Sequence, residues 1–333
     1  MKSTLVIFII GLLCLAGVNR YVWRDHDTEG HMRIVASDGK GYYKYLPDIF
    51  LSHTFGEEAP DERFIYDVNG QGVIKYPAGT AMAMLPFFGA GYIMARLSHL
   101  EEDGYSDPYQ KAIGIGGIFY FLLGLFSLDR LLQLYRMRTL TRIAVLIFMA
   151  VGTNLLAYAT LHPSWSHIYS WCFVAVFLYH SKKGMTTGGE RYLYYAALWW
   201  SIVVLIRPVN GVVLLALPFL AESAHNLKQR ISGIRLRHVL LTGIIVFAIG
   251  SIQMGLWHYQ SGQWIVWSYP NEGFDWLHPA PFRVLFGLRK GLFIYTPLLL
   301  LSVCGTWLWM KRNRFEAINL AVFFLAITYV ISS

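Results

Sequence analysis

Charged residues are scarce in this chain. Asp, Glu, Lys and Arg make up 14% of its 333 residues, against roughly 25% in soluble domains. Apolar residues reach 55%, and several stretches of 15 or more residues carry no charge. Because a helix needs about 20 mainly apolar residues to cross a bilayer, this shortage excludes an ordinary soluble domain. It predicts an all-α, polytopic membrane protein.

Cysteine is also scarce. Cys14, Cys172 and Cys304 all fall inside apolar runs without metal-site spacing, which indicates packing residues and no disulfide framework. The sequence lacks a Walker A loop, a zincin helix, a nucleophile elbow and a kinase signature. The formal charge of +8 does not indicate nucleic-acid binding, because the basic residues form short clusters between apolar runs, as cytoplasmic loops do.

The apolar runs predict about nine transmembrane helices within a single domain, residues 1–333. The first run, residues 4–18, lacks a convincing cleavage site, and we interpret it as an uncleaved helix. Residues 19–78 hold ten carboxylates and seven basic side chains. They must lie outside the hydrocarbon, since a charge at its centre costs at least about 2.5 kcal/mol. The other predicted spans are residues 112–128, 143–161, 165–181, 192–206, 208–221, 239–258, 291–310 and 317–331.

The basic residues predict the orientation. Four loops, residues 129–142, 182–191, 222–238 and 311–316, hold together with Lys2 15 Lys or Arg against four acids. The rest of the chain holds 13 against 16. The positive-inside rule therefore places the four loops in the cytoplasm.

This orientation constrains the apolar run at residues 79–95. Residues 4–18 end outside and residues 112–128 must start outside, so the run between them cannot cross. We expect a short, bent juxtamembrane or re-entrant helix, in agreement with Pro86 inside the run. Residues 19–111 then form one outer loop with juxtamembrane helices, and residues 259–290 form a second outer loop.

The segment DGKGYYKYLP, which begins at Asp38, is the strongest candidate for a reaction site. Asp38 can act as a general base, and Tyr42 and Tyr43 can keep the ring buried and the hydroxyl in water. Gly39 and Gly41 permit a tight backbone. The alternative is an ordinary surface turn with interfacial tyrosines.

Several basic residues are candidates for binding a phosphate. Lys75, followed by Tyr76, either holds a lipid phosphate or only extends its amine toward the headgroups. Arg289 and Lys290 lie at an outer helix end, where the positive-inside bias makes a basic pair unusual and favours an anionic partner. Arg207 in LIRPVN is either functional or the turn of a re-entrant hairpin.

Other polar residues fall on the same side. His162 and His167 in HPSWSH lie on different faces of a regular helix, so substrate contact is favoured over metal ligation. Glu272 and Asp275 are either second acids or solvated loop carboxylates. The sequence assigns no metal ligand.

The order of these segments resembles the GT-C class of membrane glycosyltransferases, specifically the bacterial relatives of protein mannosyltransferases and aminoarabinose transferases in glycosyltransferase family 39. The shared layout is a first helix, DGKGYYKYLP, KYPAG, LHPSWSHIYSW, LIRPVNG and RKGLFIYTP. The resemblance implies a catalytic carboxylate at Asp38, and a lipid-phosphate motif at Lys75, Tyr76 and Pro77 in which Tyr replaces the first Pro of a Lys-Pro-Pro-like motif. Ile74 replaces the carboxylate expected before that motif, and a divalent cation is a possible cofactor. Family members continue through further helices, which implies that this chain is C-terminally truncated.

These observations predict a glycosyltransferase at the periplasmic face of a bacterial inner membrane. It would move a sugar from a polyprenyl-phosphate donor to a hydroxyl on a lipid, glycan or protein. Asp38 would be the general base, while Lys75, Arg289 and Lys290 would hold the phosphate. The main alternative is a transporter or lipid flippase, against which the chain shows no obvious inverted repeat and few charges inside its helices. A non-catalytic envelope scaffold is a weaker alternative.

Overall fold

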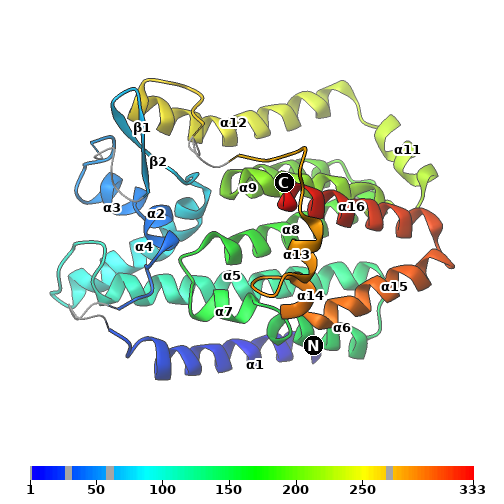
Figure 1. Cartoon of the computed structure of the whole chain (residues 1–333), viewed down its shortest axis with the longest axis horizontal. Helices are drawn as coiled ribbons and strands as arrows, with labels where there is room; N and C mark the ends of the chain where they lie inside the picture. Colours follow the sequence, from blue (N-terminus) through cyan, green and yellow to red (C-terminus); the bar gives the residue numbers. More distant parts are fainter. Residues whose placement is uncertain (1, 27–31, 58–63, 268–272) are drawn as a thin grey trace.

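The computed structural model describes residues 2–26, 32–57, 64–267 and 273–333, and there the chain is mostly helical (Figure 1). Five helical segments in these described ranges are long and apolar enough to cross a membrane. They are α1 (Lys2–Gly17) with its continuation η1 (Val18–Val22), α4 (Gly79–Leu97), α5 (Asp107–Leu134), α12 (Leu236–Ser261) and α16 (Arg314–Ser332).

Further helices complete the chain. The predicted span 143–161 is divided in two after Val151, where the Thr153 hydroxyl donates to the Met149 carbonyl at 2.7 Å, a local bond that competes with helix continuation. The further elements are α6 (Thr139–Val151), α7 (Leu155–Thr160), α8 (Ser166–Thr187), α9 (Arg191–Ile206), the 3-10 helix η2 (Pro208–Ala216), α10 (Leu217–Leu220), α11 (Ala224–Ser232), α13 (Pro281–Phe286), α14 (Leu292–Tyr295), η3 (Pro297–Leu299) and α15 (Leu300–Met310).

Helix α5 is the centre of the bundle and packs against α1, α4 and α8. Helix α1 runs antiparallel to it. The Ser3 hydroxyl meets Asp129, Gly11 lies so close to Leu122 that a Cβ would come within 2.7 Å of it, and Trp23 reaches Gly114. Helix α1 thus covers α5 from residue 129 back to residue 114.

Helix α4 covers the other half of α5. The Tyr120 hydroxyl donates to the Ala83 carbonyl at 2.8 Å, and a Cβ on Gly91 would lie 2.7 Å from the Tyr109 Cα. Helix α4 is one unbroken helix of 19 residues with Pro86 inside it, so the expectation of a short element is wrong. Packing on α5 outweighs the roughly 3 kcal/mol cost of an interior proline.

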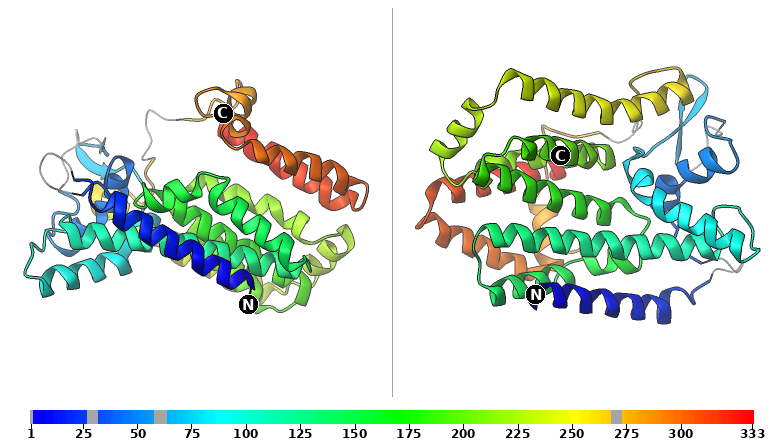
Figure 2. Two further views of the ribbon diagram at one scale, coloured as in Figure 1. Left: turned by 90° about the horizontal axis from the view of Figure 1, so that it is seen from below. Right: turned by 180° about the vertical axis from the view of Figure 1, so that it is seen from behind.

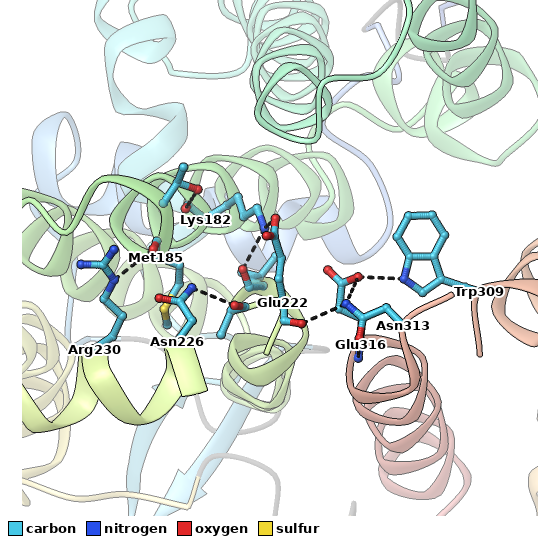
Figure 3. A network of polar contacts seen from close by, with 11 residues as sticks. Lys182, Met185, Glu222, Asn226, Arg230, Trp309, Asn313 and Glu316 are labelled. Carbon is cyan, nitrogen blue, oxygen red and sulfur yellow. Dashed lines mark hydrogen bonds and ion pairs between the residues drawn. The ribbon is translucent and has the colours of Figure 1, made fainter. Parts of the chain in front are cut away.

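The four basic loops meet at one end of the molecule, which we call the basic end, and Figure 3 shows the contacts among three of them. Lys182 is buried and donates to the Glu222 carboxylate, and its ammonium lies 4.0 Å from the centre of the Tyr135 ring. The side-chain amide of Asn313 donates to the Glu222 carbonyl at 2.9 Å. These contacts join all four loops, as expected if they lie on one side of a membrane.

The N-terminus belongs to the basic end as well. Asp129 is 2% exposed and accepts hydrogen bonds from Ser3 at 3.1 Å and Gln133 at 2.6 Å. Its other carboxylate oxygen lies 3.5 Å from the Arg142 guanidinium. One buried carboxylate thereby joins α1, α5 and α6.

The opposite end, which we call the hairpin end, carries α2 (Asp38–Tyr43), α3 (Tyr45–Phe50) and a two-stranded hairpin (Figure 1). Strands β1 (Ile65–Val68) and β2 (Gln71–Ile74) pair antiparallel. Asn69 and Gly70 both have positive φ, as a two-residue hairpin turn requires. The all-α prediction omitted this hairpin, although Asn-Gly between two apolar runs is a strong hairpin signal.

The C-terminal helices α15 and α16 form a separate helical hairpin beside the main bundle (Figure 2). Helix α16 packs against η2, α10 and α13. At its start, the Glu316 carboxylate is buried and accepts from the Trp309 indole at 2.8 Å and from Asn313 at 2.9 Å (Figure 3). The Asn313 contact with Glu222 then connects this hairpin to the bundle.

Replacing Asp129 by Ala tests the attachment of α1. The substitution leaves the partly buried Arg142 guanidinium without its counter-charge, and breaking a buried pair in this way costs about 3 kcal/mol or more. We expect a clear fall in the thermal unfolding midpoint in detergent, followed by tryptophan fluorescence. Arg138→Gln, an exposed position of the same loop, is the control, and an equal midpoint in the two variants would contradict the assignment.

Candidate functional site

A cavity of about 400 Å³ lies at the hairpin end, where α2, the β2–α4 connection, the start of α8 and the end of α9 meet. The sequence singled out six of its lining residues, from four separate segments. The lining consists of Asp38, Tyr42, Lys75, Tyr76, Trp165, Ser166, His167 and Arg207.

Asp38 reaches the cavity because α2 packs tightly against its neighbours. A Cβ on Gly39 would lie 2.0 Å from the Ser164 hydroxyl, and a Cβ on Gly41 would lie 2.6 Å from the Tyr76 ring. Ser37, which precedes the helix, has a φ of 51°, a strained backbone of the kind that gathers at functional sites. The two glycines therefore serve close packing in a short helix.

Arg207 reaches the cavity through an extended residue between two helices. It ends α9 with a φ of −151°, and Pro208 begins η2. A Cβ on Gly79, at the start of α4, would lie 2.5 Å from the backbone at Leu205 and Ile206. The close approach of α4 to α9 brings Arg207 to the cavity that Lys75 also lines.

Aromatic rings form one wall. The Tyr42 and Tyr76 rings stack with centroids 4.1 Å apart, and the Ser166 hydroxyl donates to the Tyr42 oxygen at 3.0 Å. Burial raises the pKa of Tyr42, although the hydrogen bond from Ser166 and the charge of Arg207 act in the opposite direction. Tyr42 therefore keeps its hydroxyl proton and is a donor available to a ligand.

Trp165 extends this wall. Its indole donates to the Ala36 carbonyl at 3.3 Å, next to α2. His162 stacks on its ring with centroids 4.7 Å apart, while His167 stacks on Tyr158 at 4.3 Å. His167 lines the cavity, whereas His162 supports Trp165 from outside the lining.

The charges of the cavity are one carboxylate, Asp38, and two cations, Lys75 and Arg207. Among the described residues, no carboxylate lies within 4 Å of the Arg207 guanidinium, and Asp38 forms no ion pair. The Lys75 ammonium lies 5.5 Å from the centre of the Tyr66 ring. Such a site can bind an anionic group next to a carboxylate that accepts a proton.

Several predicted residues lie elsewhere. Tyr43 is fully buried and donates to the Gly104 carbonyl at 2.6 Å, so it is a core residue and its predicted ligand contact is wrong. Arg289 and Lys290 are exposed and do not line the cavity, because α13, which precedes them, packs against α14 and α16. The expectation that this pair shares one phosphate site with Lys75 is wrong. Glu272 lies outside the described residues.

The sequence analysis did not predict two of the lining residues, Trp165 and Ser166. Both lie in HPSWSH, in which only the two histidines were candidates. Ser164 in the same segment donates to the Ile34 carbonyl at 2.8 Å. The available signal was the position of HPSWSH on the outer side of a predicted span, which makes every polar side chain in it a candidate.

No family model, curated protein or solved structure matches this chain. Within the described residues, no three or more His, Cys, Asp or Glu side chains gather into a group that could hold a metal ion. The geometry of the cavity is therefore the basis for a functional assignment.

Gly39→Ala tests the packing of α2 on the start of α8. The new methyl group would overlap Ser164, and overpacking of this kind costs about 1 to 3 kcal/mol. We expect a lower unfolding midpoint for Gly39→Ala and a smaller loss for Gly39→Ala in a Ser164→Gly background, because that change removes the clashing atoms. Gly17→Ala, with nothing within 4 Å of the added Cβ, is the control. Additive effects of Gly39→Ala and Ser164→Gly would contradict the proposed contact.

Proposed function

We propose that this protein is a membrane glycosyltransferase of the GT-C type that takes a sugar from a polyprenyl-phosphate donor and gives it to a hydroxyl acceptor. The observation that carries the proposal is the cavity, which is lined by the carboxylate of Asp38, by the cations Lys75 and Arg207, and by stacked aromatic rings. A phosphate-linked sugar requires all three features: an anion site, a base and a flat apolar surface.

The two cations serve the leaving group. Lys75 offers a compact ammonium and Arg207 a planar fork of donors that fits phosphate oxygens. As the bond between the sugar carbon and the phosphate oxygen breaks, that oxygen keeps the electron pair and the phosphate gains negative charge. Fixed positive charge at this point lowers the barrier, because it stabilises the transition state more than the ground state.

Asp38 serves the acceptor. Its carboxylate takes the proton of the acceptor hydroxyl while the oxygen forms the new bond to the sugar carbon. Attack occurs on the face opposite the phosphate, so the configuration of the sugar is inverted. Tyr42 and Trp165 present a ring edge, a hydroxyl and an indole face to the sugar, as suits a ligand that is polar at its rim and apolar on its faces.

The arrangement around α5 supports the proposed topology. Helix α1 covers α5 from residue 129 to residue 114, whereas α4 lies against residues 109 to 120. If α1 crosses the bilayer, most of α4 lies at or beyond its outer boundary. We therefore propose that α4 is a juxtamembrane helix despite its sufficient length, and that the nine predicted spans cross the membrane.

The proposed location is the bacterial inner membrane, with the basic end in the cytoplasm and the cavity at the periplasmic face. This orientation follows the positive-inside rule, since the four loops, with 14 basic residues, gather at the basic end together with Lys2. The two ends of the molecule thus differ in charge as the two faces of the membrane require.

Replacing Asp38 by Asn tests the proposed base. We expect transfer of a labelled sugar from its polyprenyl phosphate to fall by about 10²- to 10⁴-fold, as is typical for loss of a general base, while donor binding persists. Lys40→Gln, on the same helix but exposed and outside the lining, should keep full activity.

The outcomes separate the candidate functions. Sugar transfer at the wild-type rate by Asp38→Asn would refute the role of Asp38 as general base. Movement of labelled lipid across a vesicle membrane, without sugar transfer by the wild-type protein, would favour a flippase.

Lys75→Gln and Arg207→Gln test the phosphate site. Each should weaken binding of the polyprenyl-phosphate sugar by about 10- to 150-fold, the usual value of a hydrogen bond to a charged group. The matched control is Arg289→Gln with Lys290→Gln, which removes two exposed positive charges away from the cavity. Affinity for the polyprenyl-phosphate sugar is measured by titration in detergent. An unchanged affinity in both cavity variants would contradict the assignment of Lys75 and Arg207 to the phosphate site.

A further inference from the structure

Helix α11 (Ala224–Ser232) lies at the basic end, across the molecule from α2 and the β1–β2 hairpin (Figure 1). Only residues 221–223 separate it from α10, and residues 233–235 separate it from α12. Helix α12 is long and apolar enough to cross a membrane. With so short a connection to it, α11 must stay at the surface of any bilayer that α12 crosses.

One face of α11 is apolar and open. A groove of about 350 Å³ runs along it and is lined by Ala224, Leu227, Lys228, Ile231 and Ser232. The spacing of three and four residues places Ala224, Leu227 and Ile231 on one helix face. The Ile231 side chain is 59% exposed, and the apolar surface continues into α12, where Leu236 is 72% exposed.

The segment that carries this groove holds basic but no acidic side chains. From Ser223 to Asn271 the sequence contains no Asp or Glu. Arg230 and Arg237 already have partners within the chain. The Arg230 guanidinium donates to the Met185 carbonyl at 3.0 Å, and the Arg237 guanidinium pairs with the Glu190 carboxylate at 3.2 Å.

Two further cations remain for an external partner. Within the described parts of the chain, no carboxylate lies within 4 Å of Lys228 or Arg235. Lys228 lines the groove itself, and Arg235 directly precedes α12. An apolar groove flanked by such cations fits a ligand with an acyl chain and an anionic head.

We propose that α11 lies in the headgroup region of the inner leaflet and binds an anionic phospholipid. An acyl chain covers Leu227 and Ile231, while the phosphate-bearing headgroup contacts Lys228 and Arg235. Amphipathic helices with basic edges bind membranes through this combination of buried apolar area and attraction to anionic lipid. The site does not involve the cavity and goes beyond the proposed transferase activity.

The first test measures how much anionic phospholipid stays bound to the protein after extraction from a membrane. The full chain, reconstituted in phosphatidylcholine with phosphatidylglycerol, is extracted with mild detergent, and the bound lipid is counted by native mass spectrometry. Lys228→Gln with Arg235→Gln should weaken phosphatidylglycerol retention by about 10- to 30-fold, from about fivefold per basic residue at a membrane surface. Arg289→Gln with Lys290→Gln removes the same charge elsewhere and should retain lipid as wild type. Equal retention in the two double variants would overturn the proposal.

A second measurement reports on the groove. Ser232→Cys in a Cys304→Ser background carries an environment-sensitive dye, since Cys14 and Cys172 are buried. Its emission should shift to the blue in vesicles that contain phosphatidylglycerol and much less in phosphatidylcholine alone, and Ile231→Ser should reduce the shift. An emission typical of water in both membranes would overturn the proposal. Disulfide-linked dimers of the unlabelled Ser232→Cys variant, formed in the vesicles with an added mild oxidant, would also overturn it, because a second copy of the chain would then occupy the groove.

Discussion

The close approach of α2 to the start of α8 is the contact on which the cavity depends. Gly39 lies against Ser164, Trp165 donates to the Ala36 carbonyl, and Ser166 donates to Tyr42. Three consecutive residues of HPSWSH thereby fix the helix that carries Asp38. A backbone held from one side by three neighbours can keep the strained Ser37 conformation, whose cost of about 1 to 3 kcal/mol requires such support.

The two ends of the molecule use polar residues in different ways. At the basic end, Asp129, Lys182 and Glu316 are buried and partnered. Asp129 and Lys182 bond to residues distant in sequence, while Glu316 joins the consecutive helices α15 and α16. At the hairpin end, Asp38 and Arg207 face a cavity and form no ion pair with a described residue. Buried ionisable groups need partners, so a pair of opposite charges left apart at a cavity is a better indication of ligand binding than a satisfied network is.

The sequence singled out six of the eight residues that the structure brings together at the cavity. Arg207 stood out because an ionisable residue between apolar helices is costly and rare, and Lys75 because it precedes an apolar helix. Arg289 and Lys290 stood out as a basic pair on the predicted outer side, but they do not line the cavity, because the place of a charged residue in a long loop depends on how the loop folds. Likewise, Pro86 suggested a short helix, whereas packing of α4 on α5 sustains a continuous one.

The sequence by itself determined the mainly helical class, the apolar segments and the grouping of the four basic loops, because hydrophobicity and charge act locally and can be counted along the chain. Tertiary structure alone decided which polar residues share the cavity. Tyr42 lines it while Tyr43, the next residue, is buried in the core, a difference set by the rotation of α2. That rotation follows from the packing of Gly39 and Gly41 against residues distant in the chain, and no local pattern encodes it.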